Sequence, residues 1–275
     1  MSGAPSADYA IFREFLQKSA GILLGDNKQY LVTSRLSKLM AAHNIDSLQE
    51  LVERMQQFTQ RSLKEAVIDA MTTNETLWFR DNHPFNIFKT RLLPEAQKSA
   101  VGKVRVWSAA CSSGQEPFSL SMLVDEYRSA NMGVLKLPVE IVATDLSREI
   151  LAVCDKAEYD SLSLGRGLSE ERLRRFFEPL GGGTWRVKAE VRNRVRFQYL
   201  NLMDSFSALG KFDAVFCRNV LIYFSADLKA DILKRIHGTL RPGGYLVLGA
   251  SEGLQGVANY YEMVQCNPGI IYRAI

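Results

Sequence analysis

The stretch Val104-Arg-Val-Trp-Ser-Ala-Ala-Cys-Ser-Ser-Gly-Gln-Glu-Pro-Phe-Ser-Leu120 decides the fold. Its β-branched start predicts a strand, its small residues a loop, and the segment around Glu116 the start of a helix. This order of elements admits a nucleotide-like ligand close to the backbone. Only Gly114 is a glycine in the loop, and no Walker lysine follows, so the stretch is not a pyrophosphate-binding fingerprint.

From this stretch to the C-terminus, short apolar runs alternate with helical segments. The runs are 104–109, 139–143, 195–200, 212–217, 245–249 and 270–273. Such alternation predicts an α/β fold with a mainly parallel sheet and helices on both faces. We expect the last long helix to run from Ala226 to Leu240 and to end at Pro242 and the two glycines after it. Ligands bind such sheets at the carboxyl ends of the strands.

One region interrupts this pattern. After the glycines at 181–183, apolar residues alternate from Trp185 to Val191, and Arg192-Asn193 suits a turn. We expect a small antiparallel β-subdomain at about 180–194 that departs from the main sheet.

The chain before this sheet has a different pattern. From Tyr9 to Met71 the apolar residues recur at helical spacing, and Ser47 with Glu50 forms a capping box. We therefore expect an all-α domain at 1–75 and a second domain at 76–275 that starts with a linker over 76–100.

The composition suits a chain with a substantial core, since 47% of its 275 residues are hydrophobic. Its four cysteines lack any CxxC spacing, and the start of the chain lacks an apolar signal segment, so we expect a reduced, cytoplasmic protein. A net charge of +4 permits an acidic partner without indicating nucleic acid. The three histidines are dispersed, and we expect no metal.

Two carboxylates suggest the ligand. Glu116 lies where a helix begins and suits either a ligand or a helix cap. Asp145 follows a predicted strand, where an acid binds ribose hydroxyls, although it suits a helix N-cap equally well. Together with the loop, the two acids favour an adenosyl ligand that carries an amine, and S-adenosylmethionine has that chemistry.

Several longer motifs sharpen this interpretation. In chain order they are Thr72-Thr-Asn-Glu-Thr-Leu-Trp-Phe-Arg80, Trp107-Ser-Ala-Ala-Cys-Ser-Ser-Gly-Gln-Glu-Pro117, Ala143-Thr-Asp145, Asn201-Leu202 and Phe212-Asp-Ala-Val-Phe-Cys-Arg-Asn-Val-Leu-Ile-Tyr-Phe224. They closely resemble the CheR-type chemoreceptor glutamate O-methyltransferases over essentially the whole chain. The resemblance implies an N-terminal all-α domain and a Rossmann-like, S-adenosylmethionine-dependent methyltransferase domain with a small inserted antiparallel β-subdomain.

The resemblance also implies roles for individual residues. Glu116 would meet the amino group of the cofactor's methionine, and Asp145 its ribose. The adenosine end would meet Asn201, Leu202 and Asn219. The site would be closed from the interdomain segment by Asn74, Thr76 and Arg80. Arg80 and Tyr223 would lie near the transferred methyl group.

The sequence departs from commoner members of the family at three places. Cys111 and Gln115 stand where alanine and a second glutamate are often found, but Glu116 keeps the implied carboxylate. The loop from Leu180 to Thr184 is short, which leaves open whether the β-subdomain docks a receptor tail peptide as in some relatives.

The chemistry of the implied reaction needs no general base. A glutamate carboxylate, with a pKa near ~4.3, is already ionised at neutral pH. The enzyme must align carboxylate, methyl carbon and sulfur, and must exclude water. Arg80 can hold the carboxylate or act as a surface ion-pair residue, and Tyr223 can face the reaction or pack in the core.

Lys28, Arg35 and Lys38 are spaced to share one helical face. They suit a solvated surface or a docking site for the acidic helices of a receptor's cytoplasmic bundle. The helical domain could also receive a regulatory protein, and the whole enzyme would be recruited to membrane receptor arrays. Two rival functions stay open, namely methylation of RNA or a small molecule, and an S-adenosylmethionine-sensing scaffold without turnover.

Overall fold

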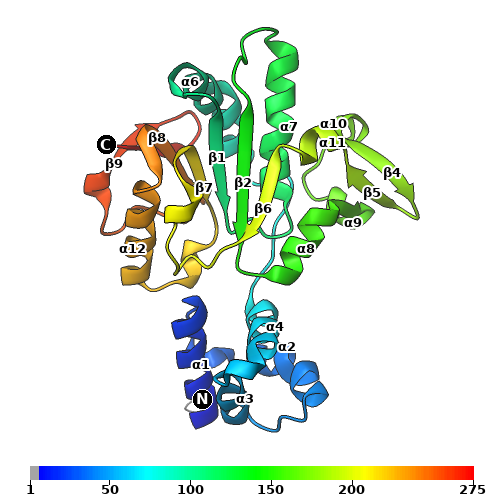
Figure 1. Cartoon of the computed structure of the whole chain (residues 1–275), viewed down its shortest axis with the longest axis vertical. Coiled ribbons are helices and arrows are strands. Elements are labelled where there is room, and N and C mark those ends of the chain that lie inside the picture. The colour runs from blue at the N-terminus through cyan, green and yellow to red at the C-terminus, as the bar shows by residue number, and fades with distance from the viewer. Residues whose placement is uncertain (1–5) are drawn as a thin grey trace.

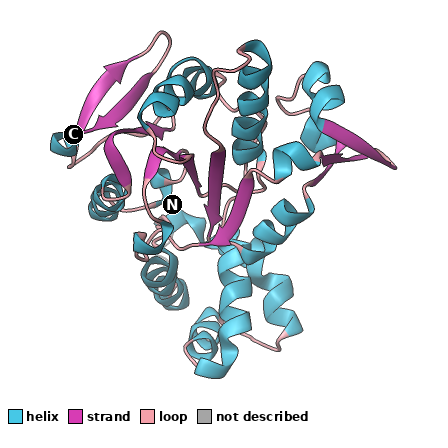
Figure 2. Ribbon diagram, turned by 45° about the horizontal axis from the view of Figure 1, so that its top comes forward, coloured by secondary structure: helices cyan, strands magenta, loops and turns pink. Residues whose placement is uncertain are grey.

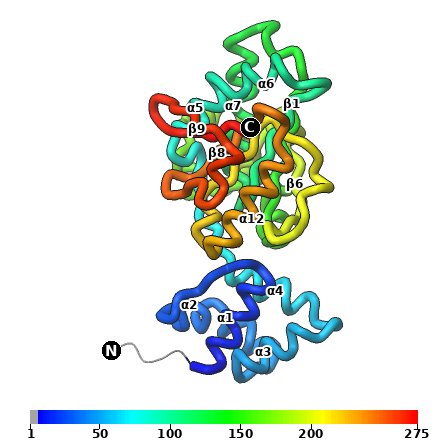
Figure 3. The backbone as a smooth tube through the Cα atoms, turned by 90° about the vertical axis from the view of Figure 1, so that its left-hand side faces the viewer, coloured from blue at the N-terminus to red at the C-terminus, as the bar shows by residue number. Residues whose placement is uncertain are grey.

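The computed structural model describes residues 6–275, and the predicted helical domain is present as four helices. They are α1 (Ala7–Ala20), α2 (Gln29–Ala42), α3 (Leu48–Met55) and α4 (Arg61–Met71), with short 3-10 turns η1 (Asp26–Lys28) and η2 (Phe58–Gln60) between them. Ser6 and Ser47 cap α1 and α3 with their side chains. Residues 1–5 of the predicted domain lie outside the described part. The helices form a separate bundle with its own apolar core, below the sheet in Figures 1 and 3.

The main sheet has the order β6-β2-β1-β7-β8-β10-β9. Its strands are β1 (Val104–Ala109), β2 (Val139–Asp145), β6 (Val195–Tyr199), β7 (Phe212–Cys217), β8 (Leu240–Leu248), β9 (Tyr261–Gln265) and β10 (Ile270–Ala274). The five strands from β6 to β8 are parallel, while β10 pairs antiparallel with β8 and β9. The prediction of a mainly parallel sheet is confirmed.

Helices cover both faces of this sheet (Figure 2). They are α5 (His83–Ile87), which continues through a π-helical turn η3 (Phe88–Leu92) into α6 (Leu93–Ser99), then α7 (Gln115–Ala130), α8 (Arg148–Lys156) and α12 (Ala226–His237). Most of the predicted linker 76–100 is therefore helical, because its apolar side chains pack against the sheet.

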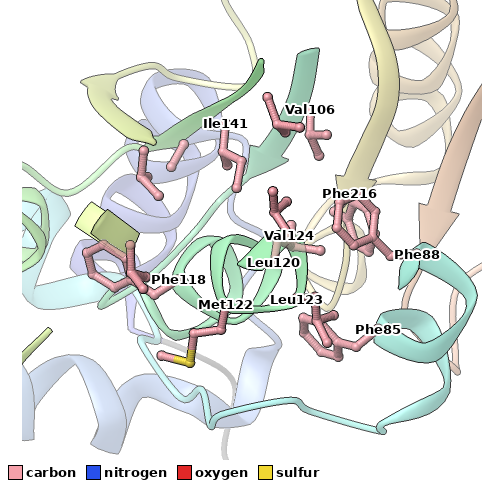
Figure 4. Close-up of a cluster of buried hydrophobic side chains, with 14 of the residues drawn as sticks. Phe85, Phe88, Val106, Phe118, Leu120, Met122, Leu123, Val124, Ile141 and Phe216 are labelled. Carbon is pink, nitrogen blue, oxygen red and sulfur yellow. The ribbon is translucent and has the colours of Figure 1, made fainter. Parts of the chain in front are cut away.

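Alternate strand residues build two cores, since successive side chains of a strand point to opposite faces. Val106 and Phe216 face the core that α5, α6 and α7 cover, and Figure 4 shows this core with Leu120 and Phe85 among its side chains. Their neighbours Trp107 and Val215 face a second core that α12 covers. This double burial fixes the strands whose carboxyl ends carry the site.

A separate three-stranded antiparallel sheet stands beside the main one. Its order is β3-β5-β4, with β3 (Glu158–Asp160), β4 (Phe177–Gly181) and β5 (Thr184–Val187). The predicted antiparallel β-subdomain is present. The prediction that its strand continues through Val191 was wrong, because Ala189–Arg192 forms a helical turn, α11. The third strand, β3, comes earlier in the chain, and the short helices α9 (Ser161–Leu164) and α10 (Glu170–Phe176) separate it from β4.

Two further predictions need correction. Helix α12 ends at His237, not at Leu240, because Thr239 and Leu240 already pair toward Phe212 of β7. Strand β8 thus includes Pro242 and its glycines, next to an irregularity in the register. Strand β9 was missed, since its residues alternate weakly and only the pairing with β10 defines it. The remaining elements are the 3-10 turns η4 (Ser207–Leu209), η5 (Leu221–Tyr223) and η6 (Ala258–Tyr260).

The helical bundle is hydrogen-bonded to the carboxyl edge of the sheet. The N–H of Leu23 donates to the carbonyl of Tyr223 at 2.9 Å, and the side-chain amide of Asn201 donates to the carbonyl of Ser19 at 2.9 Å. Gly21 ends α1 at φ +73°, and a Cβ there would lie 2.7 Å from the Leu228 side chain. The segment after α1 therefore lies close to the carboxyl ends of the strands, and it forms a wall opposite them.

Candidate active site

A cavity of about 360 Å³ lies between this wall and the carboxyl ends of the parallel strands. Its volume is that of a site for a small molecule. The predicted residues that line it are Lys28, Arg35, Asn74, Thr76, Arg80, Glu116, Asp145, Asn201, Leu202, Asn219 and Tyr223. The structure thus brings together residues that are far apart in the sequence, and of the predicted site residues only Lys38 is outside this lining.

The loop between β1 and α7 is held in an unusual conformation. Ala110 and Ser112 have positive φ values of 56° and 50°, and Gly114 has a φ of 91°. The N–H of Cys111 donates to the carbonyl of Thr144 at 2.9 Å, and the hydroxyl of Tyr159 donates to the carbonyl of Ser113 at 2.6 Å. Left-handed residues are costly, so their concentration here indicates a loop shaped for close approach of a ligand.

Glu116 lies in the first turn of α7 and its side chain is 12% exposed. One carboxylate oxygen accepts from the Ser108 hydroxyl at 2.7 Å, and the other from Nη1 of Arg218 at 3.0 Å. Its partners therefore lie on strand ends, and the first-turn capping alternative has no hydrogen bond to support it. The carboxylate lines the cavity, where it can receive an ammonium group.

Asp145 ends β2 and connects the loop between β1 and α7 to the start of α8. Its two oxygens accept from the backbone N–H of Ser112 at 2.8 Å and of Ser147 at 3.0 Å. Ser147, not Asp145, is the N-cap of α8. Burial raises the pKa of Asp145, while the N–H donors oppose this effect. The residue keeps accepting capacity toward the cavity that it lines, as a ribose diol requires.

The interdomain segment forms another side of the cavity. Arg35 donates to the last carbonyls of α4, with Nη1 at 2.9 Å from the oxygens of both Met71 and Thr72. The carbonyl of Asn74 accepts from the hydroxyl of Ser112 at 3.0 Å. These contacts fix the start of the segment that carries Thr76 and Arg80. The guanidinium of Arg35 thus binds the start of this segment. Lys28 and Lys38, in contrast, are exposed.

Arg80 lies in a strained turn. Phe79, Asp81 and Asn82 all have positive φ values, of 51°, 69° and 49°. Arg218 holds this turn, because its Nη2 donates to the carbonyl of Arg80 at 2.9 Å and to the carboxylate of Asp81 at 2.7 Å. Strain of this kind persists only where the surroundings enforce it. The half-buried guanidinium of Arg80 makes one weak contact, to the Glu75 carbonyl at 3.3 Å, so its other donors can bind an anion.

The remaining predicted residues come from two loops after the strands. Asn201 is buried, and its amide group is used by Ser19 and by the N–H of Met203, so it contributes to the wall of the cavity. Leu202 gives that wall an apolar side chain. Asn219 follows β7 at φ 59°, and Tyr223 ends η5 with its carbonyl bound to Leu23.

Arg218 was missed by the sequence interpretation, although it connects the two most important parts of the site. Its side chain is 2% exposed, and it contacts Glu116 and Asp81 at once. Its Nε atom is buried without a hydrogen-bond partner in the described part of the chain. A charged residue directly after the apolar strand Phe212–Cys217 was the available signal, because a buried arginine needs partners.

The donor set fits S-adenosylmethionine. Glu116 and Asp145 offer separate carboxylates for an ammonium and a ribose, and the apolar part of the lining suits a base. Residues 6–275 hold no group of histidines, cysteines or acids arranged for a metal ion. Burial raises the pKa of the thiols of Cys111 and Cys217, so they stay protonated. No helix in that range has the length and apolarity to cross a membrane.

Comparisons with known proteins give the family of the chain. The family model described as "CheR methyltransferase, SAM binding domain" matches residues 74–270, and "CheR methyltransferase, all-alpha domain" matches residues 7–72. The chain is 62% identical to "Chemotaxis protein methyltransferase 1" of Pseudomonas aeruginosa, over 98% of this chain and 99% of that protein. It is 60% identical to "Chemotaxis protein methyltransferase Cher2" of Pseudomonas putida, over 97% and 98%.

Among solved structures, the N-methyltransferase NodS of Bradyrhizobium japonicum in complex with S-adenosyl-L-homocysteine aligns with 79% of this chain and 99% of that one, at a TM-score of 0.42 and 14% identity. The two family matches together span both parts of the fold described above. The chain therefore belongs to the CheR methyltransferase family and is an S-adenosylmethionine-dependent methyltransferase of chemotaxis.

Proposed function

We propose that this enzyme transfers the methyl group of S-adenosylmethionine to the side-chain carboxylate of glutamates on chemoreceptors, giving glutamate methyl esters. The observation that carries the proposal is the exposed part of Arg80 at the cavity, held in a strained turn by Arg218. A guanidinium so placed suits a carboxylate acceptor, since it can bind both oxygens.

The residues of the chain divide the work. Bound S-adenosylmethionine would supply a methyl group on a positively charged sulfur. The ionised glutamate carboxylate would attack the methyl carbon in line with the carbon–sulfur bond, which breaks and leaves S-adenosylhomocysteine. In our proposal, Glu116 binds the ammonium group and Asp145 the ribose, while Asn201, Leu202 and Asn219 border the adenosine. Arg80 offsets the cost of removing the glutamate anion from water.

Tyr223 is the second residue that we place beside the reacting carboxylate. It lies at the end of η5 and lines the cavity. Its hydroxyl can donate a hydrogen bond to the acceptor oxygen that does not attack. Asn74 and Thr76 close the cavity from the interdomain segment, which limits access of water.

For receptor docking we propose the exposed Lys28 and Lys38 on the helical part, with Arg35 behind them fixing the interdomain segment. Their charge suits the acidic helices of a receptor's cytoplasmic bundle. We place the functional boundary near residue 75, with the helical part facing the receptor or a regulatory protein. The enzyme would then act in the cytoplasm at membrane receptor arrays.

One experiment tests the reaction. The protein is incubated with methyl-labelled S-adenosylmethionine and a receptor cytoplasmic fragment, and base-labile methyl ester on glutamate is measured. Label on RNA or a metabolite would favour the rival enzyme, and cofactor binding without any transfer would favour the sensing scaffold. Either result would overturn the proposal.

A second experiment tests the docking surface. The double variant Lys28→Glu and Lys38→Glu should raise KM for the receptor fragment about tenfold at low salt, because rim charges act mainly on encounter. Lys38→Glu alone should leave the affinity for S-adenosylhomocysteine unchanged, because Lys38, unlike Lys28, does not line the cavity. Lys98→Glu, an exposed lysine on α6, is the matched control. An equal effect of the control would count against a local docking surface.

A further inference from the structure

Glu252 lies outside the cavity, in the loop after β8, and its carboxylate is surrounded by backbone donors. One oxygen accepts from the N–H of Asn219 at 2.7 Å and of Gly249 at 2.8 Å. The other accepts from the N–H of Val220 at 3.0 Å and of Leu221 at 2.8 Å. A single side chain therefore satisfies three successive N–H groups of the loop after β7.

These three N–H groups converge because the loop has an unusual backbone. Asn219 is left-handed at φ 59°, Val220 has φ −123° and ψ −35°, and η5 starts at Leu221. Successive N–H groups around a left-handed residue form a concave site that attracts an anion. Here the chain supplies that anion itself, so the carboxylate stabilises a left-handed conformation that non-glycine residues seldom adopt and asparagine tolerates best.

Gly249 leaves the space that this arrangement needs. A Cβ at position 249 would lie 2.7 Å from the nearer Glu252 oxygen and 2.9 Å from the backbone nitrogen of Asn219. A side chain there would force the carboxylate and the loop apart. The contact of the Glu252 carboxylate with this loop thus requires a glycine at position 249.

The loop held in this way carries two residues of the proposed site. Asn219 and Tyr223 line the cavity, while Glu252 is not part of the lining. The carbonyl of Tyr223 also receives the hydrogen bond from Leu23 of the helical part. A shift of the loop would therefore displace both site residues without touching the cofactor directly.

We propose that Glu252 is a positioning residue for methyl transfer, which acts through the backbone of Asn219, Val220 and Leu221 on the placement of Asn219 and Tyr223. This inference rests on the function proposed above. A positioning role differs from a general role in stability. If Glu252 acts through Asn219 and Tyr223, its replacement should reduce activity only while those two residues are intact.

The test is a pair of double-mutant cycles on the full chain. Glu252→Gln keeps the shape but turns one acceptor oxygen into a donor that faces N–H groups. We expect kcat for the receptor fragment to fall about 10- to 100-fold, since small misplacements at a reacting centre have effects of this size. In a Tyr223→Phe background, the same change should cost about twofold or less, because the placement of the hydroxyl no longer matters.

The second cycle uses cofactor affinity and no receptor. Calorimetry with S-adenosylhomocysteine should show weaker binding of Glu252→Gln in the wild-type background and a smaller effect in an Asn219→Ala background. Glu262→Gln is the matched control, because Glu262 pairs with Arg273 at the surface of β9. It should leave both readouts unchanged.

Gly249→Ala provides an independent variant and should reproduce the pattern of Glu252→Gln in both cycles. Equal losses with and without Tyr223 or Asn219, or no loss at all, would overturn the inference. If the wild-type protein forms no glutamate ester, the proposed function fails, while the calorimetric cycle still decides whether Glu252 positions Asn219.

Discussion

At the two ends of the parallel sheet, an arginine contacts carboxylates in different ways. At the amino ends, Arg105 of β1 donates to Glu140 of β2 at 2.7 Å and to the carbonyl of Leu209 at 2.8 Å. Its backbone N–H donates to Asp213 of β7 at 2.7 Å. These bonds join neighbouring strands and loops within one scaffold.

At the carboxyl ends, Arg218 joins Glu116 to the strained turn that carries Arg80. Its Nε atom has no partner within residues 6–275. The next residue in the chain, Asn219, is left-handed, and so is Asp81, whose carboxylate Arg218 contacts. Arginine and carboxylate side chains therefore stabilise the fold at the amino ends, and at the carboxyl ends they hold the turn that carries Arg80. What separates them is the cavity, which leaves charged groups at one end available to a ligand.

The sharpest test of this contrast is Arg80→Ala. Turnover with the receptor fragment should fall about 100-fold or more, since a charged contact made to the reacting group is lost. The melting temperature should change little, because within residues 6–275 the Arg80 side chain makes a single weak hydrogen bond. Arg105→Ala should behave in the opposite way, with lower stability and normal turnover per folded molecule. A large loss of stability in Arg80→Ala would contradict the contrast between Arg80 at the site and Arg105 in the scaffold.

Asp145→Ala should have the next largest effect. We expect the Kd for S-adenosylhomocysteine to rise about 10- to 100-fold, because a charged acceptor for the ribose and an anchor of the Ser112 loop are removed together. Titration calorimetry measures this change directly. Unchanged affinity would remove Asp145 from the proposed site.

Glu140→Gln should affect stability alone. The change removes the charge that Arg105 and Lys103 share, and we expect the free energy of unfolding to fall by about 1–2 kcal/mol. Urea unfolding gives this number, and kcat measured on the folded variant should equal that of the wild type. A loss of turnover would mean that the amino ends also contribute to the site.

The smallest expected effect is the pH dependence of the difference in unfolding free energy between the wild type and Glu140→Gln. Despite partial burial, which opposes the shift, the hydrogen bonds and charges of Arg105 and Lys103 lower the pKa of Glu140 from 4.5 to about 2. A lowered folded-state pKa means that the stabilisation is fully present above pH 4.5 and is lost as the pH falls toward 2. The gap between wild type and Glu140→Gln should therefore close over this range in acid unfolding curves.

Much of the fold could be predicted because its signals are local. The strands Val104–Ala109 and Phe212–Cys217 have the bounds that their apolar runs indicated, and the Ser47 cap marks the start of α3. Strand β9 was missed because its existence depends on pairing with β10. The three-residue strand β3 is likewise defined by contact with β5, which lies far along the chain.

The candidate site shows the same division. The residues suggested by motifs line the cavity, because strand ends and helix starts are local features that a parallel sheet brings together. Arg218 and Glu252 could not be found in this way. Their roles depend on hydrogen bonds to residues about a hundred and about thirty positions away, at turns whose conformation only the folded chain reveals.

The walls of the cavity come from both the helical bundle and the sheet, and Ser19 and Leu23 bind directly to residues beside the cofactor site. A ligand that fills the cavity adds its binding free energy, RT ln(1 + [L]/Kd), to the contacts that keep the two parts together. The docked arrangement thus becomes thermodynamically linked to the supply of S-adenosylmethionine and to the accumulation of its product. In this sense a bound cofactor would also hold the helical bundle and the sheet together.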